Sequence, residues 1–367
     1  MEARGIGVGT LALACLLSAF SSLRAQADNA DAGTAIGADE RKAANRYRTY
    51  LEIPERRTEG VRGLLKMGAA AIDALILGAK HPDAKIACIN MQILGELGEL
   101  ALPAEATLKA LAKSKDPIIS SAAGWADIRI NRTGALLIVE FQSGRIVSLP
   151  AAGDPIVVLK KIPNAFDVER VAGGNYLVAQ YQQKQVVEYT PDGKEVWSYK
   201  ELKSPLDADR LANGNTLICD SSGNKVIEVD RTGKIVWSYE NCKKPYDADR
   251  LPNGNTLITE YPKGVVEVDA SGKVIWEYQG KEPVGADRLP NGNTLITNSQ
   301  SREVLEVDSA GKTVMQLRDL TRPVESRRLS NGHTVVAEQN RVREFDAAGK
   351  VVRTIALADQ PGTVHVY

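Results

Sequence analysis

Histidine and cysteine are scarce in this 367-residue chain, and neither sign of charge dominates it. Lys and Arg together number 46, as do Asp and Glu, so the formal net charge is zero. A nucleic-acid-binding protein needs a basic surface to displace counterions from phosphates, and this composition predicts none. After the N-terminus no apolar run is long enough to span a bilayer, so no transmembrane anchor is predicted in the mature chain.

Motifs for common cofactors and catalytic centres are missing as well. The sequence has no G-x-G-x-x-G after a strand, no P-loop, no G-x-S-x-G and no H-E-x-x-H. Beyond the N-terminal segment the cysteines are Cys88, Cys219 and Cys242, whose spacing matches no metal motif. An oxidising compartment would permit one disulfide among them, but we interpret them as buried or incidental thiols.

The first 27 residues are typical of a secretory signal. Arg4 lies in a short n-region, an apolar stretch follows from Ile6 to Phe20, and Ala25-Gln26-Ala27 forms an A-x-A cleavage site. Lipidation at Cys15 is the alternative, although Ala12 replaces the Leu usual in a lipobox. We therefore expect an exported protein, periplasmic or extracellular, in which residues 28–38 form a small, polar linker.

Residues 39–130 have helical periodicity, with apolar side chains three and four residues apart. One helix is expected to end before His81-Pro82-Asp83, the next to run from about Ile86 to Gly98, and others to begin at Pro103 and at Asp116-Pro117. The repeated helix, turn and Asp start resembles the HEAT-type repeat. This region is either a helical cap on the rest of the chain or a separate binding solenoid.

A second repeat occupies residues 131–367. Glycines lie 40, 40, 40, 38 and 40 residues apart, at Gly134, Gly174, Gly214, Gly254, Gly292 and Gly332. Self-similarity at this period is the sequence signature of propeller blades. The chain is therefore predicted to be mainly β, with a six-bladed β-propeller preceded by the small α-helical HEAT-like domain.

Each unit divides into four strands. In the third unit Asn213-Gly214 is expected to form a type I′ hairpin between an inner strand and a strand over Asn215–Cys219. Two further strands follow, over Val226–Asp230 and Ile235–Tyr239, and both are rich in β-branched residues. Trp197, Trp237 and Trp276 recur at one position, and we interpret them as packing between blades, with an aromatic ligand platform as the alternative.

The first unit lacks its inner strand, because a helix is predicted to continue to about Ile130. The third to sixth units carry a seven-residue segment that begins with proline before the hairpin, namely Pro205–Leu211, Pro245–Leu251, Pro283–Leu289 and Pro323–Leu329, and the chain ends in Pro361–Tyr367 in the same register. We predict that Thr363–Tyr367 supplies the missing strand. This closure removes the open edges of the ring.

The repeat resembles two propeller families. The Leu-Pro-Asn-Gly-Asn hairpin, here Leu251 to Asn255, resembles the bacterial arylsulfotransferase type, and Gly-Lys before Trp237 and Trp276 resembles the pyrroloquinoline-quinone-like repeat. The first resemblance implies a histidine as sulfuryl acceptor with further basic groups. Of the three histidines, His81 lies in the helical region and His333 is expected to be exposed at a turn, so only His365 is expected to face the axis. The second resemblance implies an eight-bladed quinoprotein with Ca²⁺ and a catalytic Asp, and here six blades and no cofactor motif are predicted.

The remaining candidates lie on the inner strands, which line the central channel of a propeller. One register position carries Thr363, Asp167, Asp207, Asp247, Gly285 and Glu325, and the position two residues on carries His365, Glu169, Asp209, Asp249, Asp287 and Arg327. We expect the first set around one mouth and the second one layer deeper. Arginines follow the acids, at Arg170, Arg210, Arg250, Arg288 and Arg328, and suggest charge pairs between neighbouring blades, because an unpaired buried charge is costly.

A polar-ligand or cation site at the channel mouth is the alternative to such pairing, because converging carboxylates suit a hard cation. No cofactor is predicted beyond this possible divalent cation. The sequence favours an exported, non-catalytic binding or scaffold protein whose partner is an unknown protein or small polar ligand. A metal-assisted hydrolase, lyase or transferase using channel carboxylates, and a cofactor-dependent oxidoreductase, remain as alternatives. A ligand is expected beside Gly285, Arg327 and His365, where the repeat is broken.

Overall fold

A computed structural model describes residues 36–366, except 133, 151–152 and 359. The predicted signal peptide, Cys15, most of the predicted linker and Tyr367 lie outside the described residues. The chain divides into two units, residues 1–43 and 44–367. Within the described part, no helix is both long and apolar enough to cross a membrane.

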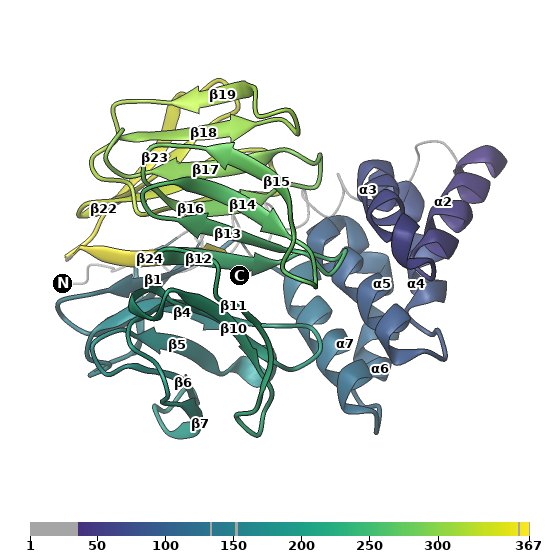
Figure 1. Cartoon of the computed structure of the whole chain (residues 1–367), viewed down its shortest axis with the longest axis horizontal. Helices are drawn as coiled ribbons and strands as arrows, with labels where there is room; N and C mark the ends of the chain where they lie inside the picture. Colours follow the sequence, from purple (N-terminus) through teal and green to yellow (C-terminus); the bar gives the residue numbers. More distant parts are fainter. Residues whose placement is uncertain (1–35, 133, 151–152, 359, 367) are drawn as a thin grey trace, which may run out of the picture. The chain divides into compact units, whose positions relative to one another are not determined.

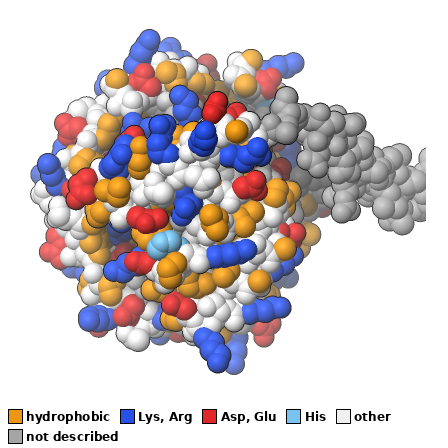
Figure 2. Space-filling view, turned by 90° about the vertical axis from the view of Figure 1, so that its right-hand side faces the viewer, with side chains coloured by type: hydrophobic (Ala, Val, Ile, Leu, Met, Phe, Trp, Pro, Cys, Tyr) orange, Lys and Arg blue, Asp and Glu red, His pale blue; other side chains and the backbone are white. Residues whose placement is uncertain are grey.

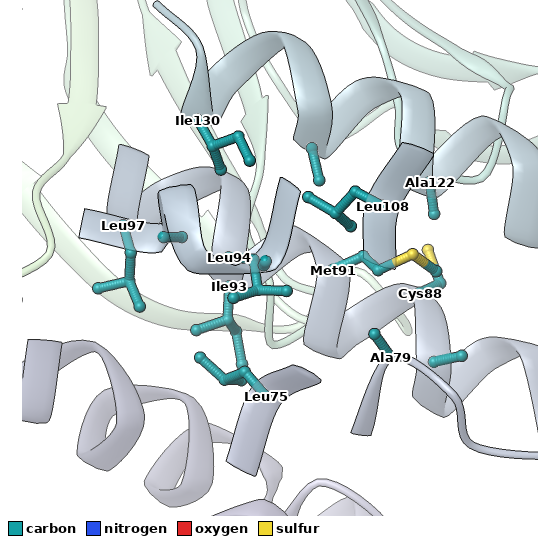
Figure 3. Packing of buried hydrophobic residues seen from close by; sticks show 14 of the residues in the cluster. Leu75, Ala79, Cys88, Met91, Ile93, Leu94, Leu97, Leu108, Ala122 and Ile130 are labelled. Atoms are coloured by element: carbon teal, nitrogen blue, oxygen red, sulfur yellow. The ribbon is translucent and has the colours of Figure 1, made fainter. Parts of the chain in front are cut away.

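Eight 3₁₀ or α-helical segments between residues 51 and 130 make up most of the helical region. The α-helices are α2 (Ala38–Tyr50), α3 (Arg57–Met67), α4 (Ile72–Gly78), α5 (Ala84–Leu97), α6 (Glu105–Leu111) and α7 (Pro117–Ile130). Short 3₁₀ turns connect them at η1 (Pro54–Arg56), η2 (Gly68–Ala71) and η3 (Gly98–Ala104). The helices between residues 57 and 130 contribute a common apolar core that includes Leu75, Met91 and Leu108 (Figure 3).

The predicted helix starts are confirmed at two aspartates. Asp83 caps α5 by accepting a hydrogen bond from the Lys85 N–H at 2.8 Å, and Asp116 caps α7 by accepting from the Ile118 N–H at 2.8 Å. The helix predicted from Pro103 is wrong by two residues. Pro103 belongs to η3 and α6 begins at Glu105.

Charged side chains of both signs cover the face of the helical region that Figure 2 draws. Lys and Arg (blue) alternate there with Asp and Glu (red) and with apolar side chains (orange). Charged side chains form local pairs along the helical segments, such as Arg56 with Glu59 and Lys109 with Glu105. Pairs of this kind are exposed to solvent and contribute little to stability.

Six four-stranded antiparallel sheets form the β-propeller (Figure 1). The second blade consists of β4 (Ala165–Arg170), β5 (Tyr176–Gln180), β6 (Gln185–Tyr189) and β7 (Glu195–Tyr199). The third consists of β8 (Pro205–Arg210), β9 (Thr216–Asp220), β10 (Lys225–Val229) and β11 (Ile235–Tyr239). The fourth consists of β12 (Pro245–Arg250), β13 (Thr256–Glu260), β14 (Gly264–Val268) and β15 (Val274–Gln279). The fifth consists of β16 (Pro283–Arg288), β17 (Thr294–Asn298), β18 (Glu303–Val307) and β19 (Thr313–Leu317). The sixth consists of β20 (Glu325–Arg328), β21 (Thr334–Glu338), β22 (Arg341–Phe345) and β23 (Val351–Ala356).

The first blade is built from both ends of the propeller, as predicted. Its strands are β24 (Pro361–Val366), β1 (Leu136–Glu140), β2 (Arg145–Leu149) and β3 (Ile156–Leu159), in that spatial order. The backbone pairs Leu137 with His365 and Ile138 with Val364. Gly362 is required at this closure because a Cβ there would lie only 2.0 Å from the Phe166 carbonyl oxygen of the second blade.

The hairpins between the first two strands of the repeat differ from the predicted type I′ turn. In the third blade Leu211 N–H donates to the Asn215 carbonyl at 2.8 Å, and Gly214 N–H donates to the Leu211 carbonyl at 2.9 Å. Gly214 has φ +88°, whereas Asn213 is not among the residues with positive φ. The loop is therefore a three-residue hairpin with a left-handed glycine. Asn213 stabilises the turn through its side-chain oxygen, which accepts a hydrogen bond from the Asn215 N–H.

Candidate functional site

The inner strands β24, β4, β8, β12, β16 and β20 surround the propeller axis and bring the two predicted layers together. Eight carboxylates belong to these layers: Asp167, Asp207, Asp247, Glu325, Glu169, Asp209, Asp249 and Asp287. The basic side chains among them are Arg327 and His365. Two arginines from the helical side join them: Arg129 of α7 lies 3.3 Å from Glu169, and the partly buried Arg132 interacts electrostatically with Asp287. Acidic groups therefore outnumber basic groups around the axis.

A cavity of about 280 Å³ opens at the mouth bounded by the loops that lead into the inner strands. Asp207, Asp247 and Glu325 line it, and Thr363 of the closing strand joins them. This confirms the predicted placement of the first layer for these residues. Its other walls include Phe141, Phe166, Tyr246, Val284 and Val324.

Asp167 does not line this cavity, contrary to the prediction for its layer. It is fully buried, and its Oδ1 accepts hydrogen bonds from Thr363 Oγ1 and His365 Nε2, both at 2.8 Å. Burial opposes its ionisation, but the His365 imidazole and these hydrogen bonds hold the pKa of Asp167 below its usual range. Asp167 and His365 thus join the second blade to the closing strand.

Asp207 and Asp247 each accept, with one carboxylate oxygen, a hydrogen bond from a backbone N–H of the next blade. Asp207 Oδ2 accepts a hydrogen bond from the Ala248 N–H at 3.1 Å, and Asp247 Oδ2 accepts from the Ala286 N–H at 2.7 Å. Their Oδ1 atoms have no hydrogen bond to another described residue. Burial, reinforced by the neighbouring carboxylates, raises the pKa of both side chains well above the usual range for Asp.

Glu325 forms no such hydrogen bond to the described residues of the next blade. Gly285 replaces the expected Asp in the preceding blade and leaves space there for the Glu325 carboxylate. A Cβ on Gly285 would lie 2.8 Å from Glu325 Oε1, so the missing side chain provides the space that the Glu325 carboxylate occupies. Glu325 Oε1 accepts a hydrogen bond from the Ser326 N–H at 3.1 Å. Burial raises the pKa of Glu325 to about 7.

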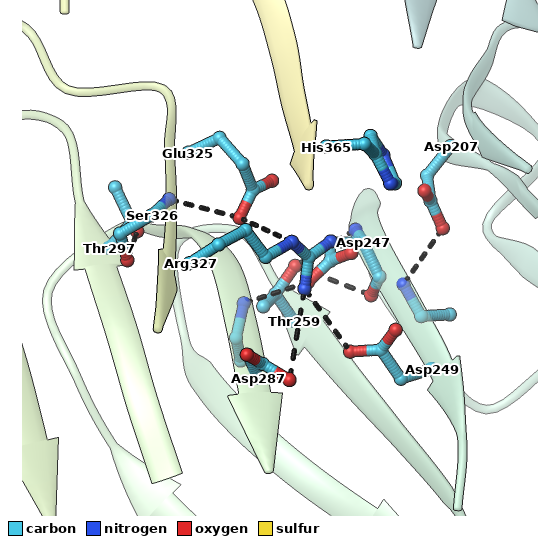
Figure 4. A network of polar contacts seen from close by, with 12 residues as sticks. Asp207, Asp247, Asp249, Thr259, Asp287, Thr297, Glu325, Ser326, Arg327 and His365 are labelled. Atoms are coloured by element: carbon cyan, nitrogen blue, oxygen red, sulfur yellow. Dashed lines mark hydrogen bonds and ion pairs between the residues drawn. The ribbon is translucent and has the colours of Figure 1, made fainter. Parts of the chain in front are cut away.

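The guanidinium of Arg327 places a positive charge in the deeper layer (Figure 4). At this register position the other blades carry an acidic residue or His365. The Arg327 guanidinium lies 3.9 Å from carboxylate oxygens of Asp249, Asp287 and Glu325. These separations are too long for direct hydrogen bonds. Although burial disfavours the cation, Glu325 and the two aspartates raise the pKa of Arg327 above its usual range.

Two deeper carboxyls are only partly compensated by Arg327. Burial raises the pKa of Asp249 to about 6, and burial together with Glu169 and Asp249 raises that of Asp209 well above the usual range. Asp249 Oδ2 is buried without a hydrogen-bond partner within the described chain. The predicted second layer is therefore present, with an excess of acid.

The helical region borders the opposite end of the channel. Ala212, in an inner hairpin, belongs to the helical core, and the pKa of Glu96 on α5 is raised by burial and, to a smaller extent, by the charge of Asp287. Arg129 stacks on Trp125 within α7 and contacts Glu169. The axis is thus lined by helical residues on this side, whereas the cavity opens on the other.

The predicted charge pairs between the inner-strand acids and the arginines that follow them are not formed by Arg210, Arg250, Arg288 and Arg328. These arginines pair instead with glutamates on the third strand of the preceding blade. Successive side chains of a strand point to opposite faces, so these arginines point between the blades. Arg210 pairs with Glu188 at 2.9 Å, and the same relationship joins Arg250 to Glu228, Arg288 to Glu267 and Arg328 to Glu306. The channel acids are therefore left without these cations.

Tryptophan packing between blades is confirmed. Arg210, Arg250 and Arg288 lie over the rings of Trp197, Trp237 and Trp276, at 4.9, 4.5 and 4.8 Å from their centroids. Each indole N–H donates to a backbone carbonyl of the next blade, with Trp237 Nε1 3.0 Å from the Ala270 oxygen. These side chains are consequently occupied within the fold.

The expectation that His333 is exposed at a turn is wrong. Its Nδ1 lies 2.6 Å from Glu344 Oε1, and 29% of the side chain is exposed. Asn215, Asn255 and Asn293 form the equivalent bonds in other blades, to Glu228, Glu267 and Glu306. His333 therefore replaces an asparagine of the repeat in its structural role.

Buried polar residues that were not predicted lie at the ends of the second strands: Glu140, Gln180, Asp220, Glu260, Asn298 and Glu338. Asp220 Oδ1 accepts hydrogen bonds from the Lys203 and Ser204 N–H groups, and Glu338 Oε2 accepts from the Thr321 N–H. They stabilise the connections that enter the inner strands. Their recurrence at the 38- to 40-residue period was the available signal.

No three His, Cys, Asp or Glu side chains of the described part of the chain lie together as a metal ion would require. Cys88, Cys219 and Cys242 are buried free thiols, and burial raises the pKa of Cys88 and Cys242 to about 12. What the channel offers chemically is a set of carboxyls beside an apolar wall.

Residues 161–290, which span the second to fourth blades and the inner strand of the fifth, match the PQQ_2 family model, described as outer membrane protein assembly factor BamB. A search of curated proteins found no match. Among solved structures, a protein of unknown function from Bacteroides caccae is 17% identical with a TM-score of 0.55, covering 63% of this chain and 97% of that one.

Two further solved structures are similar over the propeller. A chain of a nidogen/laminin complex is 14% identical with a TM-score of 0.53, covering 63% of this chain and 97% of that chain. Virginiamycin B lyase from Staphylococcus aureus is 14% identical with a TM-score of 0.47, covering 62% and 85%. At these identities the likeness shows the fold alone, a β-propeller, which in this chain has six blades, and the PQQ_2 match is confined to residues 161–290.

Proposed function

We propose that this protein is an exported, non-catalytic binding protein that takes a small organic cation into the cavity at the open mouth of its propeller. The observation that carries the proposal is the composition of this cavity, which places Asp207, Asp247 and Glu325 beside aromatic and aliphatic walls. Its volume of about 280 Å³ fits a small organic molecule, at the lower end of ligand pockets in general.

The carboxylates supply the charge for such a ligand. Asp207 and Asp247 are at most 5% exposed, and each retains one oxygen without a hydrogen bond to any described residue. Burial, reinforced by repulsion between the neighbouring carboxylates, raises the pKa of each well above the usual range. A cation between them relieves this repulsion and replaces the missing hydrogen bonds.

The aromatic walls favour an organic cation over a bare metal ion. Phe141, Phe166 and Tyr246 line the same cavity, and Phe141 stacks on Tyr181 with ring centroids 5.8 Å apart. An ammonium or guanidinium group gains from both carboxylates and aromatic faces, and its carbon chain gains from apolar walls. A hydrated divalent cation gains only from the carboxylates.

Export is proposed on two grounds. The N-terminal 27 residues have the features of a secretory signal, and residues 161–290 match a family described as an outer membrane protein assembly factor. The helical region is proposed to cap the propeller, because its core includes Ala212 of an inner hairpin. Binding of a protein partner by its HEAT-like turns is the scaffold alternative.

The proposal is tested by titrating the protein with cadaverine, ethanolamine and Ca²⁺ in separate calorimetric and thermal-melting experiments. We expect the amines to bind and raise the melting temperature, since a ligand at 100 times its Kd adds about 2.7 kcal/mol to the unfolding free energy. Stabilisation by Ca²⁺ alone would overturn the proposal and support the metal-assisted alternative. No response to any amine would also overturn it.

Asp247→Asn is the decisive variant, with Glu277→Gln on exposed β15 as its matched control. The Asn oxygen keeps the hydrogen bond from the Ala286 N–H but removes one buried charge. We expect the variant to melt higher than wild type without ligand, yet to bind cadaverine at least tenfold more weakly. A variant that melts lower and binds equally well would show that Asp247 has only a structural role.

A further inference from the structure

A second hollow adjoins the mouth cavity and has the opposite charge. Its volume is about 440 Å³, and Tyr261, Gln300, Arg302 and Arg322 line it. It shares Tyr246, Val284, Ser299 and Arg322 with the mouth cavity, so the two form a continuous depression from the axis toward the loops of the fourth and fifth blades. None of its lining residues is acidic.

Arg322 lies at the junction of the two hollows. It is exposed, and within the described chain its side chain has no hydrogen bond or ion pair. Arg302 donates through Nε to the Leu320 carbonyl at 2.7 Å, which orients its guanidinium and leaves its terminal nitrogens for other acceptors. Guanidinium groups bind carboxylates and phosphates through paired hydrogen bonds.

Tyr246 and Tyr261 form an aromatic, hydrogen-bonded wall of the second hollow, and Tyr246 also lines the mouth cavity. Tyr246 and Tyr261 lie with ring centroids 5.6 Å apart. The Tyr261 hydroxyl accepts from Gln300 Nε2 at 2.9 Å and donates to Glu282 Oε1 at 3.2 Å, so its ring is held in place. A rigid apolar surface therefore connects the acidic and basic ends.

We infer that the ligand is dipolar: its amine is bound by Asp207, Asp247 and Glu325, and an anionic group at its other end is bound by Arg322 and Arg302. This inference rests on the proposed function and names the ligand class more narrowly. The opposite charges lie in adjoining hollows, so a small zwitterion such as an amino acid or an aminoalkyl phosphate fits both. A simple diamine would place its second ammonium beside two arginines.

Matched probes test the inference. Lysine is cadaverine with one added carboxylate, and phosphoethanolamine is ethanolamine with one added phosphate. We expect wild type to bind the anionic member of at least one pair about five- to tenfold more tightly than its parent amine. Preference for lysine would indicate a carboxylate ligand, and preference for phosphoethanolamine a phosphate ligand.

Arg322→Met assigns the preference to this side chain, with Arg318→Met as a matched control outside both hollows. The variant should lose the preference while binding the parent amine as well as wild type does or more tightly, because a repelling charge has been removed. A structural role would weaken both members equally. Equal binding of both members by wild type overturns this inference alone, whereas no binding of any probe overturns the proposed function with it.

Discussion

A Cβ on Gly285 would lie 2.8 Å from the Glu325 carboxylate of the next blade. The two residues occupy the same register position, where the third and fourth blades carry Asp207 and Asp247. The loss of one acid thus makes room for a longer one. Glu325 therefore lines the mouth cavity and bonds to the Ser326 N–H of its own strand, whereas Asp207 and Asp247 bond to the next blade.

Gly285→Ala should therefore disturb the ligand site more than the fold. The carboxylate is the mobile end of a long side chain and can move, so we expect a change of less than about 1 kcal/mol in the free energy of unfolding. Cadaverine affinity should fall several-fold. The Gly285→Ala/Glu325→Asp pair should bind no more weakly than the worse single variant, because residues in contact are not additive. Additive losses in calorimetric titration would contradict this relationship.

Arg250 tests the contacts between blades. It pairs with Glu228 at 2.8 Å and stacks on Trp237, and both charged side chains are about nine-tenths buried. Arg250→Ala leaves Glu228 buried without its cation and should lower the free energy of unfolding by roughly 3–5 kcal/mol. Lys200→Ala is the control, because its pair with Glu195 is exposed and should contribute at most about 0.5 kcal/mol. Urea denaturation measures both, and equal effects would contradict the burial argument.

The propeller itself was predictable because the repeat specifies each step locally. Glycines at a constant period mark the hairpins, β-branched residues mark the outer strands, and the proline register of Pro361 identifies the closing strand. The type of hairpin was not predictable from Asn213-Gly214, because Asn satisfies either a positive φ or a side-chain cap.

The candidate site was only partly predictable. Alternation along a strand places Asp207 and Asp209 on the axis, and the same alternation turns Arg210 away from them, toward Glu188 of the neighbouring blade. Asp167 is withdrawn from the cavity by Thr363 and His365, residues nearly 200 positions away. The aromatic wall combines Phe141, from the loop after β1, with Phe166 and Tyr246 of the inner strands β4 and β12.

Closure of the ring should depend on the bond between His365 and Asp167. His365→Ala removes a hydrogen bond to a fully buried carboxylate and should cost about 1–3 kcal/mol, and deletion of residues 361–367 should cost more because β1 loses its partner. Adding Asp167→Asn to His365→Ala should cost less than the sum of the two single changes, since both disrupt one interaction. Full stability of the truncated protein in thermal melting would refute closure by β24.

Stability should fall as the pH rises from about 4 to about 7. In the folded protein the pKa of Asp249 is about 6 and that of Glu325 about 7, whereas unfolded Asp and Glu titrate near 4. The folded state therefore binds more protons between these values, so the free energy of unfolding decreases with pH there, by up to about 3 kcal/mol for each group. The lowered pKa of Asp167 acts in the opposite direction, but only below about pH 4.

Glu325→Gln should flatten this profile in urea denaturation between pH 4.5 and 8, because its side chain cannot ionise. The exposed Glu277→Gln control should leave the profile unchanged. Over the same range cadaverine should bind wild type more tightly as the pH rises, since ionised carboxylates bind the ammonium group and protonated ones do not. Opposite slopes for stability and affinity are expected only if the same carboxyls control both. A wild-type stability that is constant or rises over this range would contradict the prediction.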